Sequence, residues 1–245
     1  MARKATINRA MTDKPGQQST ERDAAERRRA EALRENLRRR KEQGRARSQQ
    51  RPEPALPAAA VLDFWFGPAG DPERASFRER WFKVDPAFDG EIAARFGPDV
   101  ERALAGAWND AVDGPHDTLA LVILLDQFPR NMFRGTAGAF AGDAFAKALA
   151  ERAIGAAWDR QLQPVERLFL YLPLEHSEAL ADQERALALF AALPESPWYA
   201  KALDAAQRHH AIIARFGRFP HRNKALGRPS TPEEIAFLAT PGSSF

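Results

Sequence analysis

The sequence predicts an all-α protein, a compact multi-helix array that runs from residue 56 to residue 245. Three observations lead to this fold class. Large apolar residues recur with a period near 3.6 in one segment after another. No segment alternates apolar and polar residues over the length of a strand. The connections between the periodic segments are short, so we expect successive helices to pack as antiparallel neighbours.

The composition supports one main domain with a sizeable core, because 44% of the 245 residues are hydrophobic and 9% are aromatic. The sequence contains no cysteine, which excludes disulfides, thiolate metal sites and a cysteine nucleophile. Such a composition is typical of a reducing compartment, and we expect a cytoplasmic protein. The longest apolar run, residues 119–125, is far shorter than the roughly 20 residues of a membrane span. No apolar stretch follows the basic start, as it would in a signal peptide, so we expect no membrane partner.

Residues 1–55 differ from the rest of the chain in charge. They hold 16 Lys and Arg against 8 Asp and Glu, a net charge of +8, whereas the remaining residues carry a net charge of −5. We predict a basic arm that is partly helical over residues 20–47 and ends in a proline-rich linker. Only Leu33 and Leu37 are large and apolar in that helix, so it lacks a face that could dock on a core.

Two interpretations of this arm stay open. One is weak contact with a polyanion, since clustered cations that neutralise phosphates release counterions. The cations concerned are Arg38, Arg39, Arg40, Lys41, Arg45 and Arg47. The other is a solvated charged helix, and charge runs of this kind are common. No aromatic residue is interleaved for base stacking, which argues against recognition of single-stranded nucleic acid.

Helix starts and connections divide the domain into eight to ten predicted helices. Asp71 precedes a proline at one predicted start, and Thr231 does the same near the C-terminus. Residues 66–68 and 97–98 combine glycine with proline and are predicted to connect helices.

Periodicity selects the residues that we expect in the core. The periodic positions are Val61, Leu62, Trp65; Phe77, Trp81; Phe88, Ile92, Phe96; Val100, Leu104, Trp108; Phe140, Phe145, Leu149; and Val165, Leu168, Leu172. By this phase Trp65, Trp81 and Trp108 belong to the core and not to a ligand-stacking site. The β-branched pair Val122 and Ile123 lies in a run rich in Leu and Ala, which favours a buried helix over a strand.

Two segments of the domain repeat a short pattern. Residues 127–131 read QFPRN and residues 218–223 read RFPHRN. In both, a proline follows an aromatic residue at the end of an apolar helix. We interpret them as related helix-turn units in a solenoid-like arrangement, although one echo does not make a repeat.

Three segments combine several polar groups with core residues: 125–134, 172–178 and 209–223. Each contains a proline that interrupts the helical hydrogen bonds and leaves backbone groups available to a ligand. Arginine forks in these segments suit a carboxylate or phosphate, and Asp126 and Glu175 could orient them. The candidate ligand-binding residues are Arg130, Asn131, Arg134, Arg215, Arg218, His221, Arg222 and Asn223. The alternative is that these arginines form buried salt bridges with those same acids.

Acid–base chemistry would fall to the acids and histidines of the same segments. The candidate catalytic residues are Asp126, Glu175, His176 and His210. His210 is the first choice among the histidines, because Ala214 and Gly217 would leave room beside its ring on one helical face. The alternative for His210 is a core histidine bonded to a buried carboxylate.

Other kinds of site find less support. A metal site would combine Asp126, Glu175, His176, His210 and His221, but the sequence has no His-Glu-x-x-His and no Glu-x-x-His pair. We therefore predict no metal and no cofactor. Ser177 lacks the glycines of a nucleophile elbow, and helix capping accounts for it. Phosphate loops, dinucleotide fingerprints and kinase signatures do not occur in the sequence.

Six motifs, in this order, carry a resemblance to a known family. They are VLDFWFG, LLDQFPRNMFRGT, FLYLPLEHSE, IIARFGRFPHRN, RPSTPEEIAFL and PGSSF. Over residues 58–245 the chain resembles the bacterial domain of unknown function 924 family (DUF924). The resemblance implies a compact all-helical fold similar to tetratricopeptide-type helical arrays. It implies no established activity and no cofactor.

The leading hypothesis is a helical domain that binds a small anionic molecule, with Arg130, Arg215 and Arg222 holding the anion and His176 or His210 exchanging a proton. Whether the domain is an enzyme stays open at this point. The rival hypothesis is a tetratricopeptide-like module that binds a protein segment without catalysis. A nucleic-acid-associated protein would rest on the basic arm alone.

Overall fold

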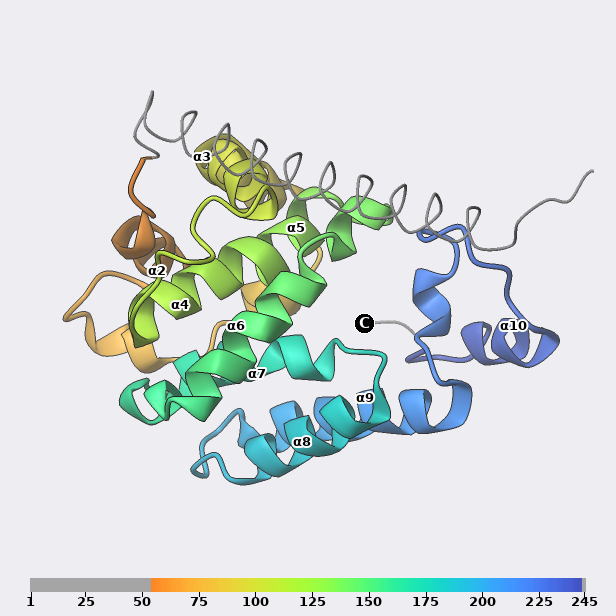
Figure 1. Ribbon diagram of the computed structural model, residues 1–245. Coiled ribbons are helices and arrows are strands. Elements are labelled where there is room, and N and C mark those ends of the chain that lie inside the picture. Colours follow the sequence, from red (N-terminus) through yellow and green to blue (C-terminus); the bar gives the residue numbers. More distant parts are fainter. Residues whose placement is uncertain (1–53, 244–245) are drawn as a thin grey trace, which may run out of the picture. The chain divides into compact units, whose positions relative to one another are not determined.

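The structure, a computed structural model, describes residues 54–243, and all regular elements in this range are helices (Figure 1). These residues contain nine α-helices, so the predictions of an all-α fold and of eight to ten helices are confirmed. The chain from Ala55 onward forms one compact unit. The predicted basic arm lies outside the described residues, apart from its last two positions.

Short 3-10 and π-helical turns alternate with the α-helices. The α-helices are α2 (Ala58–Phe66), α3 (Pro86–Leu104), α4 (Pro115–Val122), α5 (Phe128–Met132), α6 (Asp143–Gly155), α7 (Pro164–Glu175), α8 (Leu180–Ala191), α9 (Tyr199–Phe216) and α10 (Pro232–Leu238). The 3-10 turns are η1 (Pro72–Ala75), η2 (Glu79–Phe82), η4 (Ala137–Phe140), η5 (Trp158–Gln161) and η6 (Pro220–Arg222), and η3 (Ile123–Gln127) is a π-helical turn. Helix α8 packs against both α7 and α9, and α4 packs against α2 and α6.

An aromatic cluster forms the core next to α2. Trp65 and Trp81 stack with their ring centroids 5.9 Å apart, and Phe169 meets the Trp81 ring edge-on at 4.7 Å. The Trp81 indole N–H donates a hydrogen bond to the backbone carbonyl of Trp65, so the polar atom of this ring is satisfied. Trp108 is also buried. The prediction that these three tryptophans belong to the core is confirmed.

Capping residues begin the helices where the sequence indicated. Thr231 opens α10 with a capping box, in which its hydroxyl accepts from the N–H of Glu234 and the Glu234 carboxylate accepts from the N–H of Thr231. Asp71 caps the N–H of Glu73, but the segment that follows is the single 3-10 turn η1. Asp85 caps α3 in the same way ahead of Pro86.

The predicted connection at residues 97–98 is wrong, because α3 continues through Pro98. A proline inside a helix removes one backbone hydrogen bond and usually ends the helix. Here Phe96 and Val100, on either side of it, are both buried and hold the helix against the core. Tertiary packing therefore outweighs the local preference of the proline.

The two echoing segments adopt different backbone conformations. Residues 127–131 lie in one continuous helical run, α4–η3–α5, in which every residue from 118 to 129 is buried. Residues 218–223 follow the end of α9, where Gly217 takes a left-handed conformation, and fold into the 3-10 turn η6. The interpretation as related helix-turn units is therefore wrong for the backbone. An arginine side chain from each segment nevertheless reaches the same carboxylate in the site described below.

Candidate functional site

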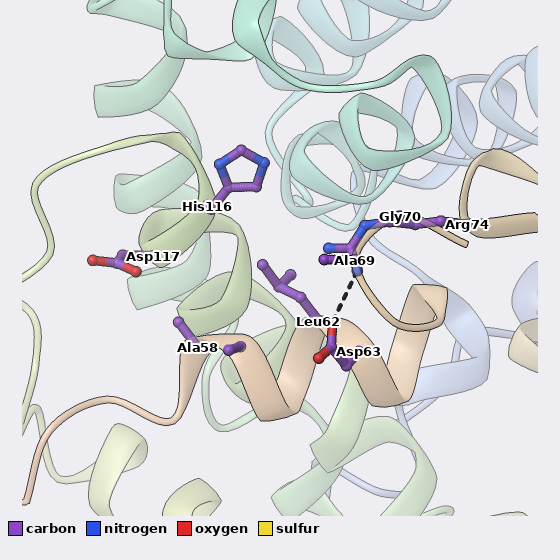
Figure 2. A pocket seen from close by; sticks show the side chains of 9 residues that line it. Ala58, Leu62, Asp63, Ala69, Gly70, Arg74, His116 and Asp117 are labelled. Carbon is purple, nitrogen blue, oxygen red and sulfur yellow. Dashed lines mark hydrogen bonds and ion pairs between the residues drawn. The ribbon is translucent and has the colours of Figure 1, made fainter. Parts of the chain in front are cut away.

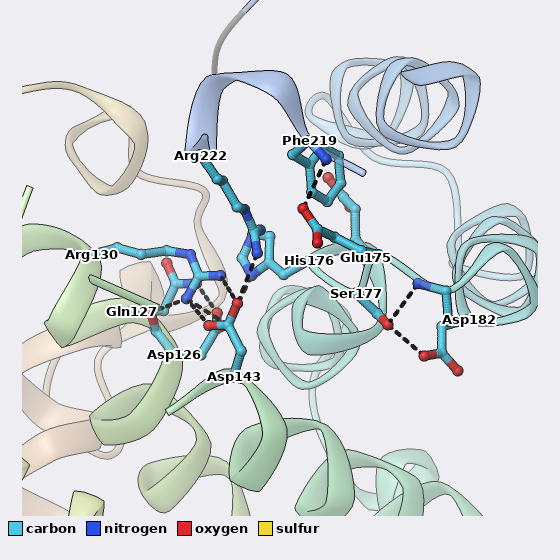
Figure 3. A network of polar contacts seen from close by, with 12 residues as sticks. Asp126, Gln127, Arg130, Asp143, Glu175, His176, Ser177, Asp182, Phe219 and Arg222 are labelled. Carbon is cyan, nitrogen blue, oxygen red and sulfur yellow. Dashed lines mark hydrogen bonds and ion pairs between the residues drawn. The ribbon is translucent and has the colours of Figure 1, made fainter. Parts of the chain in front are cut away.

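Asp126 lies at the centre of a buried polar cluster (Figure 3). The π-helical turn η3 places its side chain in the interior, fully buried, and π turns of this kind often occur at functional sites. Its Oδ1 lies 2.8 Å from Nδ1 of His176 and 2.9 Å from a guanidinium nitrogen of Arg130. Its Oδ2 accepts a hydrogen bond from the Gln127 amide at 2.6 Å. Burial by itself raises the pKa of the Asp126 carboxyl, but Arg130 and His176 outweigh it and hold the pKa well below its usual range.

His176 is the C-cap residue directly after helix α7 and is nearly buried, with 13% of its side chain exposed. Burial, and next the charge of Arg130, lower the pKa of the imidazole, and Asp126 offsets this only in part. The ring is therefore neutral at neutral pH. An ionised carboxylate can only accept, so Nδ1 carries the proton that His176 donates to Asp126. The lone pair of the neutral ring then lies on Nε2.

Arg130 and Arg222 converge on a second acid of the cluster, Asp143, the first residue of α6 (Figure 3). Arg130 Nη1 lies 2.9 Å from Asp143 Oδ1, and its Nη2 donates to Oδ2 at 3.1 Å. Arg222 Nη1 donates to the same Oδ2 at 3.0 Å. Two arginines from segments more than 80 residues apart thus share one carboxylate. Sequence reasoning missed Asp143, because no motif or helical spacing links it to either arginine.

The Arg222 guanidinium is almost completely buried, yet its Nε makes no hydrogen bond to any residue that the structure describes. Burial, and next the charge of Arg130, lower the pKa of Arg222 to about 10, and Asp143 offsets this only in part. Burial and the Arg222 charge likewise lower the pKa of His221 to about 3. The cluster therefore disfavours further positive charge at this end.

Glu175 pairs with His209, one residue before the predicted His210. The Nδ1 atom of His209 lies 2.9 Å from Glu175 Oε1 and 2.8 Å from the carbonyl of Ala205, and both side chains are buried. His210 itself is partly exposed. The structure thus realises at His209 the core-histidine alternative that we considered for His210. Helical spacing could have indicated this, since Ala206, His209 and Ile213 share the buried face of α9.

Three of the predicted arginines form ion pairs outside this cluster. Arg134 pairs with Asp89 at 2.6 Å, Arg215 with Glu233 at 2.8 Å and Arg218 with Glu234 at 2.7 Å. Arg215 and Glu233 are both more than half exposed. These pairs follow the salt-bridge alternative, although with other acids than Asp126 and Glu175.

The predicted asparagines join these outer ion pairs. Asn131 donates to Asp89 at 2.7 Å, and Asn223 donates to Ser230 and to Glu234. The structure therefore gathers Asp126, Arg130, His176 and Arg222 around one point. It gives separate partners to Glu175, Asn131, Arg134, Arg215, Arg218 and Asn223.

A second ion pair holds the η6 segment in place. Glu178 receives two hydrogen bonds from Arg228, at 2.7 and 2.9 Å, and a third from the backbone N–H of Phe219. Arg228 also donates to the carbonyl of Phe219. These contacts fasten the turn that carries Arg222 to the connection between α7 and α8. Sequence reasoning missed this pair, because its members are 50 residues apart.

An open surface hollow of about 410 Å³ lies elsewhere, beside α2 and the start of α4 (Figure 2). Its lining includes Asp63, Arg74, His116 and Asp117. Arg74 already pairs with Asp63 at 3.0 Å. None of the predicted site residues lines this hollow, so it is separate from the cluster around Asp126.

The structure offers neither a metal centre nor a membrane span within residues 54–243. No group of three or more His, Asp or Glu in this range is arranged to hold a metal ion. No helix in the same range is long and apolar enough to cross a membrane.

Comparison with known proteins places the chain in a family. The family described as "Bacterial protein of unknown function (DUF924)" matches residues 61–242. A solved structure, of the protein of unknown function ATU0120 from Agrobacterium tumefaciens, is 41% identical and superposes with a TM-score of 0.65. The match covers 74% of this chain and 96% of that one. A search of curated proteins found no match. The chain belongs to the DUF924 family of bacterial proteins.

Proposed function

We propose that this domain binds a small anionic molecule at Arg222 and uses the Asp126–His176 pair for acid–base catalysis. The observation that carries the proposal is the contact of His176 Nδ1 with the buried Asp126 carboxylate at 2.8 Å. This contact fixes the tautomer of an imidazole that is neutral at neutral pH. A neutral, oriented imidazole is the usual general base of enzymes.

The proton transfer follows from the tautomer. Nε2 of His176 would accept a proton from the bound molecule, and the resulting imidazolium would face the ionised Asp126. Stabilisation of that cation by a fixed carboxylate lowers the cost of the transfer without new reorganisation. The same proton would return from Nε2 to the product, so His176 ends the cycle neutral.

Arg222 supplies the anion contact. A buried guanidinium is stable when its donors meet acceptors, and Asp143 is the one carboxylate within ion-pair distance of it among residues 54–243. An anion that accepted from Nε would satisfy the donor that has no hydrogen bond. The lowered pKa of Arg222 fits this, because it reports a cation in surroundings that an added anion would stabilise.

Charge balance makes binding and protonation depend on each other. Arg130 and Arg222 together balance Asp126 and Asp143, and His176 is neutral. A bound anion that has no proton to give, such as acetate, adds one negative charge, which raises the pKa of His176 and favours uptake of one proton from solvent at the same Nε2. Binding is therefore expected to tighten as the pH falls towards the native pKa of His176.

Thermal melts with added anions test the binding. Acetate or phosphate should raise the melting temperature beyond chloride at equal ionic strength, since a ligand at about 100 times its Kd stabilises the native state by about 2.7 kcal/mol. Arg222→Gln should abolish this increment. Arg215→Gln, which removes an exposed arginine, is the matched control and should keep it. A wild type that responds to acetate and phosphate as it does to chloride would contradict the proposal and favour the tetratricopeptide-like interaction module.

Calorimetry tests whether His176 takes up a proton when the anion binds. Binding measured in two buffers of different ionisation enthalpy should show uptake of up to one proton by the wild type. His176→Gln should still bind the anion but take up much less. Equal proton uptake by the variant and the wild type would remove His176 from the proposed chemistry.

A further inference from the structure

We infer that the Asp143 carboxylate stands in the place of the ligand's own carboxylate, and that a small carboxylic acid competes with it for Arg130 and Arg222. The inference rests on the proposed function and names the class of molecule that the site takes. It also explains which carboxylate Arg130 and Arg222 share when no ligand is bound.

The two arginines reach Asp143 from the segments that echo each other in sequence. Phe128 and Phe219 are completely buried and anchor the two segments, each followed by a proline. Arg130 and Arg222 then extend to the same carboxylate, with nitrogen–oxygen distances of 2.9 to 3.1 Å. The two segments therefore resemble each other in what their side chains contact, because each places an arginine on the Asp143 carboxylate.

The position of Asp143 allows its side chain to rotate away from Arg130 and Arg222. Its side chain is 22% exposed, whereas that of Asp126 is fully buried. The backbone beside it is tightly held, since a Cβ on Gly142 would lie only 2.1 Å from the carbonyl oxygen of Leu125. A fixed backbone with a partly exposed carboxylate allows exchange by rotation of the side chain alone.

The geometry favours a carboxylate over other anions. Asp143 offers a planar pair of oxygens, and three guanidinium contacts fit it. The Arg222 Cζ lies 4.6 Å from the ring centroids of both Phe140 and Phe219, so two aromatic rings pack against the guanidinium. The N–H donors of a guanidinium lie in its plane. A flat acceptor of the shape of Asp143 meets these donors best.

An acetate titration of Asp143→Asn tests the inference. Asparagine keeps the shape but removes the competing charge, so half-maximal stabilisation should occur at about tenfold lower acetate than in the wild type. Asp89→Asn is the matched control, because Asp89 is also paired with an arginine, Arg134, but outside the cluster around Asp126. That control should respond to acetate as the wild type does.

Four results would overturn the inference. An equal response of the wild type and Asp143→Asn rejects competition while the proposed anion site stands. No response in either protein rejects both proposals. An equal gain in Asp89→Asn shows a general charge effect, and phosphate that acts as strongly as acetate rejects the carboxylate class.

A measurement on the unaltered protein covers the case in which Asp143→Asn does not fold. The Nε–H signal of Arg222 in a nitrogen-15 NMR spectrum should shift saturably as acetate is added. The Nε–H signal of Arg134, which already donates to Asp89, should stay in place. An Arg222 signal that does not move with acetate would overturn the inference.

Discussion

The protein has two buried centres with opposite physical requirements. The aromatic centre, formed by Trp65, Trp81 and Phe169 with their neighbours, is stabilised by removal of apolar surface from water. The polar centre around Asp126 and Arg130 is stable only while each charge keeps its partner. The first should therefore respond to lost volume and not to pH. The second should respond to single charges and to protons.

The largest effect is expected from Trp81→Ala. Trp81 is buried against Trp65 and Phe169, and truncation leaves a cavity that costs about 3–5 kcal/mol of unfolding free energy. Urea unfolding at pH 7 and at pH 5 should give the same loss, because no titrating group changes. A loss below about 1 kcal/mol would place η2 at the surface and break the comparison.

Asp126→Asn should have the next largest effect on the free energy of unfolding. The substitution keeps the shape but leaves Arg130 with Asp143 as its remaining ion-pair partner, so we expect a loss of about 3 kcal/mol of unfolding free energy. Loss of the carboxylate also lowers the pKa of His176 further, since Asp126 raises it. Urea unfolding measures the first effect and NMR titration of His176 the second. An unchanged His176 titration would contradict the contact between the two side chains.

Acidification should destabilise the polar centre. Native His176 and His221 have pKa values below the ordinary value of 6.5, about 3 for His221, so the unfolded chain binds more protons. Stability is then fully present above about pH 6.5 and falls as the pH drops towards 3, by about 1 kcal/mol per pH unit for His221. His176 adds a loss of the same sign until the pH reaches its own native pKa. Asp126, whose pKa is also lowered, adds to the loss below its ordinary value of 3.8.

Two histidine variants check this slope. His221→Gln should flatten the dependence of unfolding free energy on pH between 6.5 and 4. His116→Gln, at an exposed position beside the surface hollow and outside the polar centre, is the matched control. Stability that rises on acidification through this range would contradict the burial of neutral histidines.

The smallest effect is expected from Arg215→Ala. Arg215 and Glu233 are both more than half exposed, and exposed ion pairs contribute about 0–1 kcal/mol. Thermal melts of the variant and the wild type should therefore nearly coincide. A loss of unfolding free energy as large as that of Asp126→Asn would show that an exposed arginine pair contributes as much to stability as the pairs of the polar centre.

Local patterns predicted most of the fold. Helical periodicity placed Trp65, Trp81 and Trp108 in the core, and the capping residues around Thr231 marked the start of α10. These signals act over one or two helical turns, so a single sequence contains them. The predicted helix break at Pro98 was wrong, because burial of the residues on both sides of the proline depends on helices that are distant in the chain.

The candidate site was predictable only in part. Asp126, His176 and the arginines came from segments rich in polar groups, which the sequence displays. Asp143 escaped because its partner Arg222 is 79 residues away and nothing local marks it. From the sequence we chose His210 where the structure buries His209. Adjacent positions on a helix point in directions about 100° apart, and only the location of the buried face decides which of the two histidines lies in the core.

The most direct test of the acid–base site is an NMR titration of the His176 ring in the presence and absence of acetate. Without acetate, the ring should be a neutral Nδ1–H tautomer at pH 7 and titrate below 6.5. Saturating acetate should raise its pKa, because the added negative charge favours the imidazolium. A His176 that carries its proton on Nε2, or whose titration does not change with acetate, would contradict the proposed function.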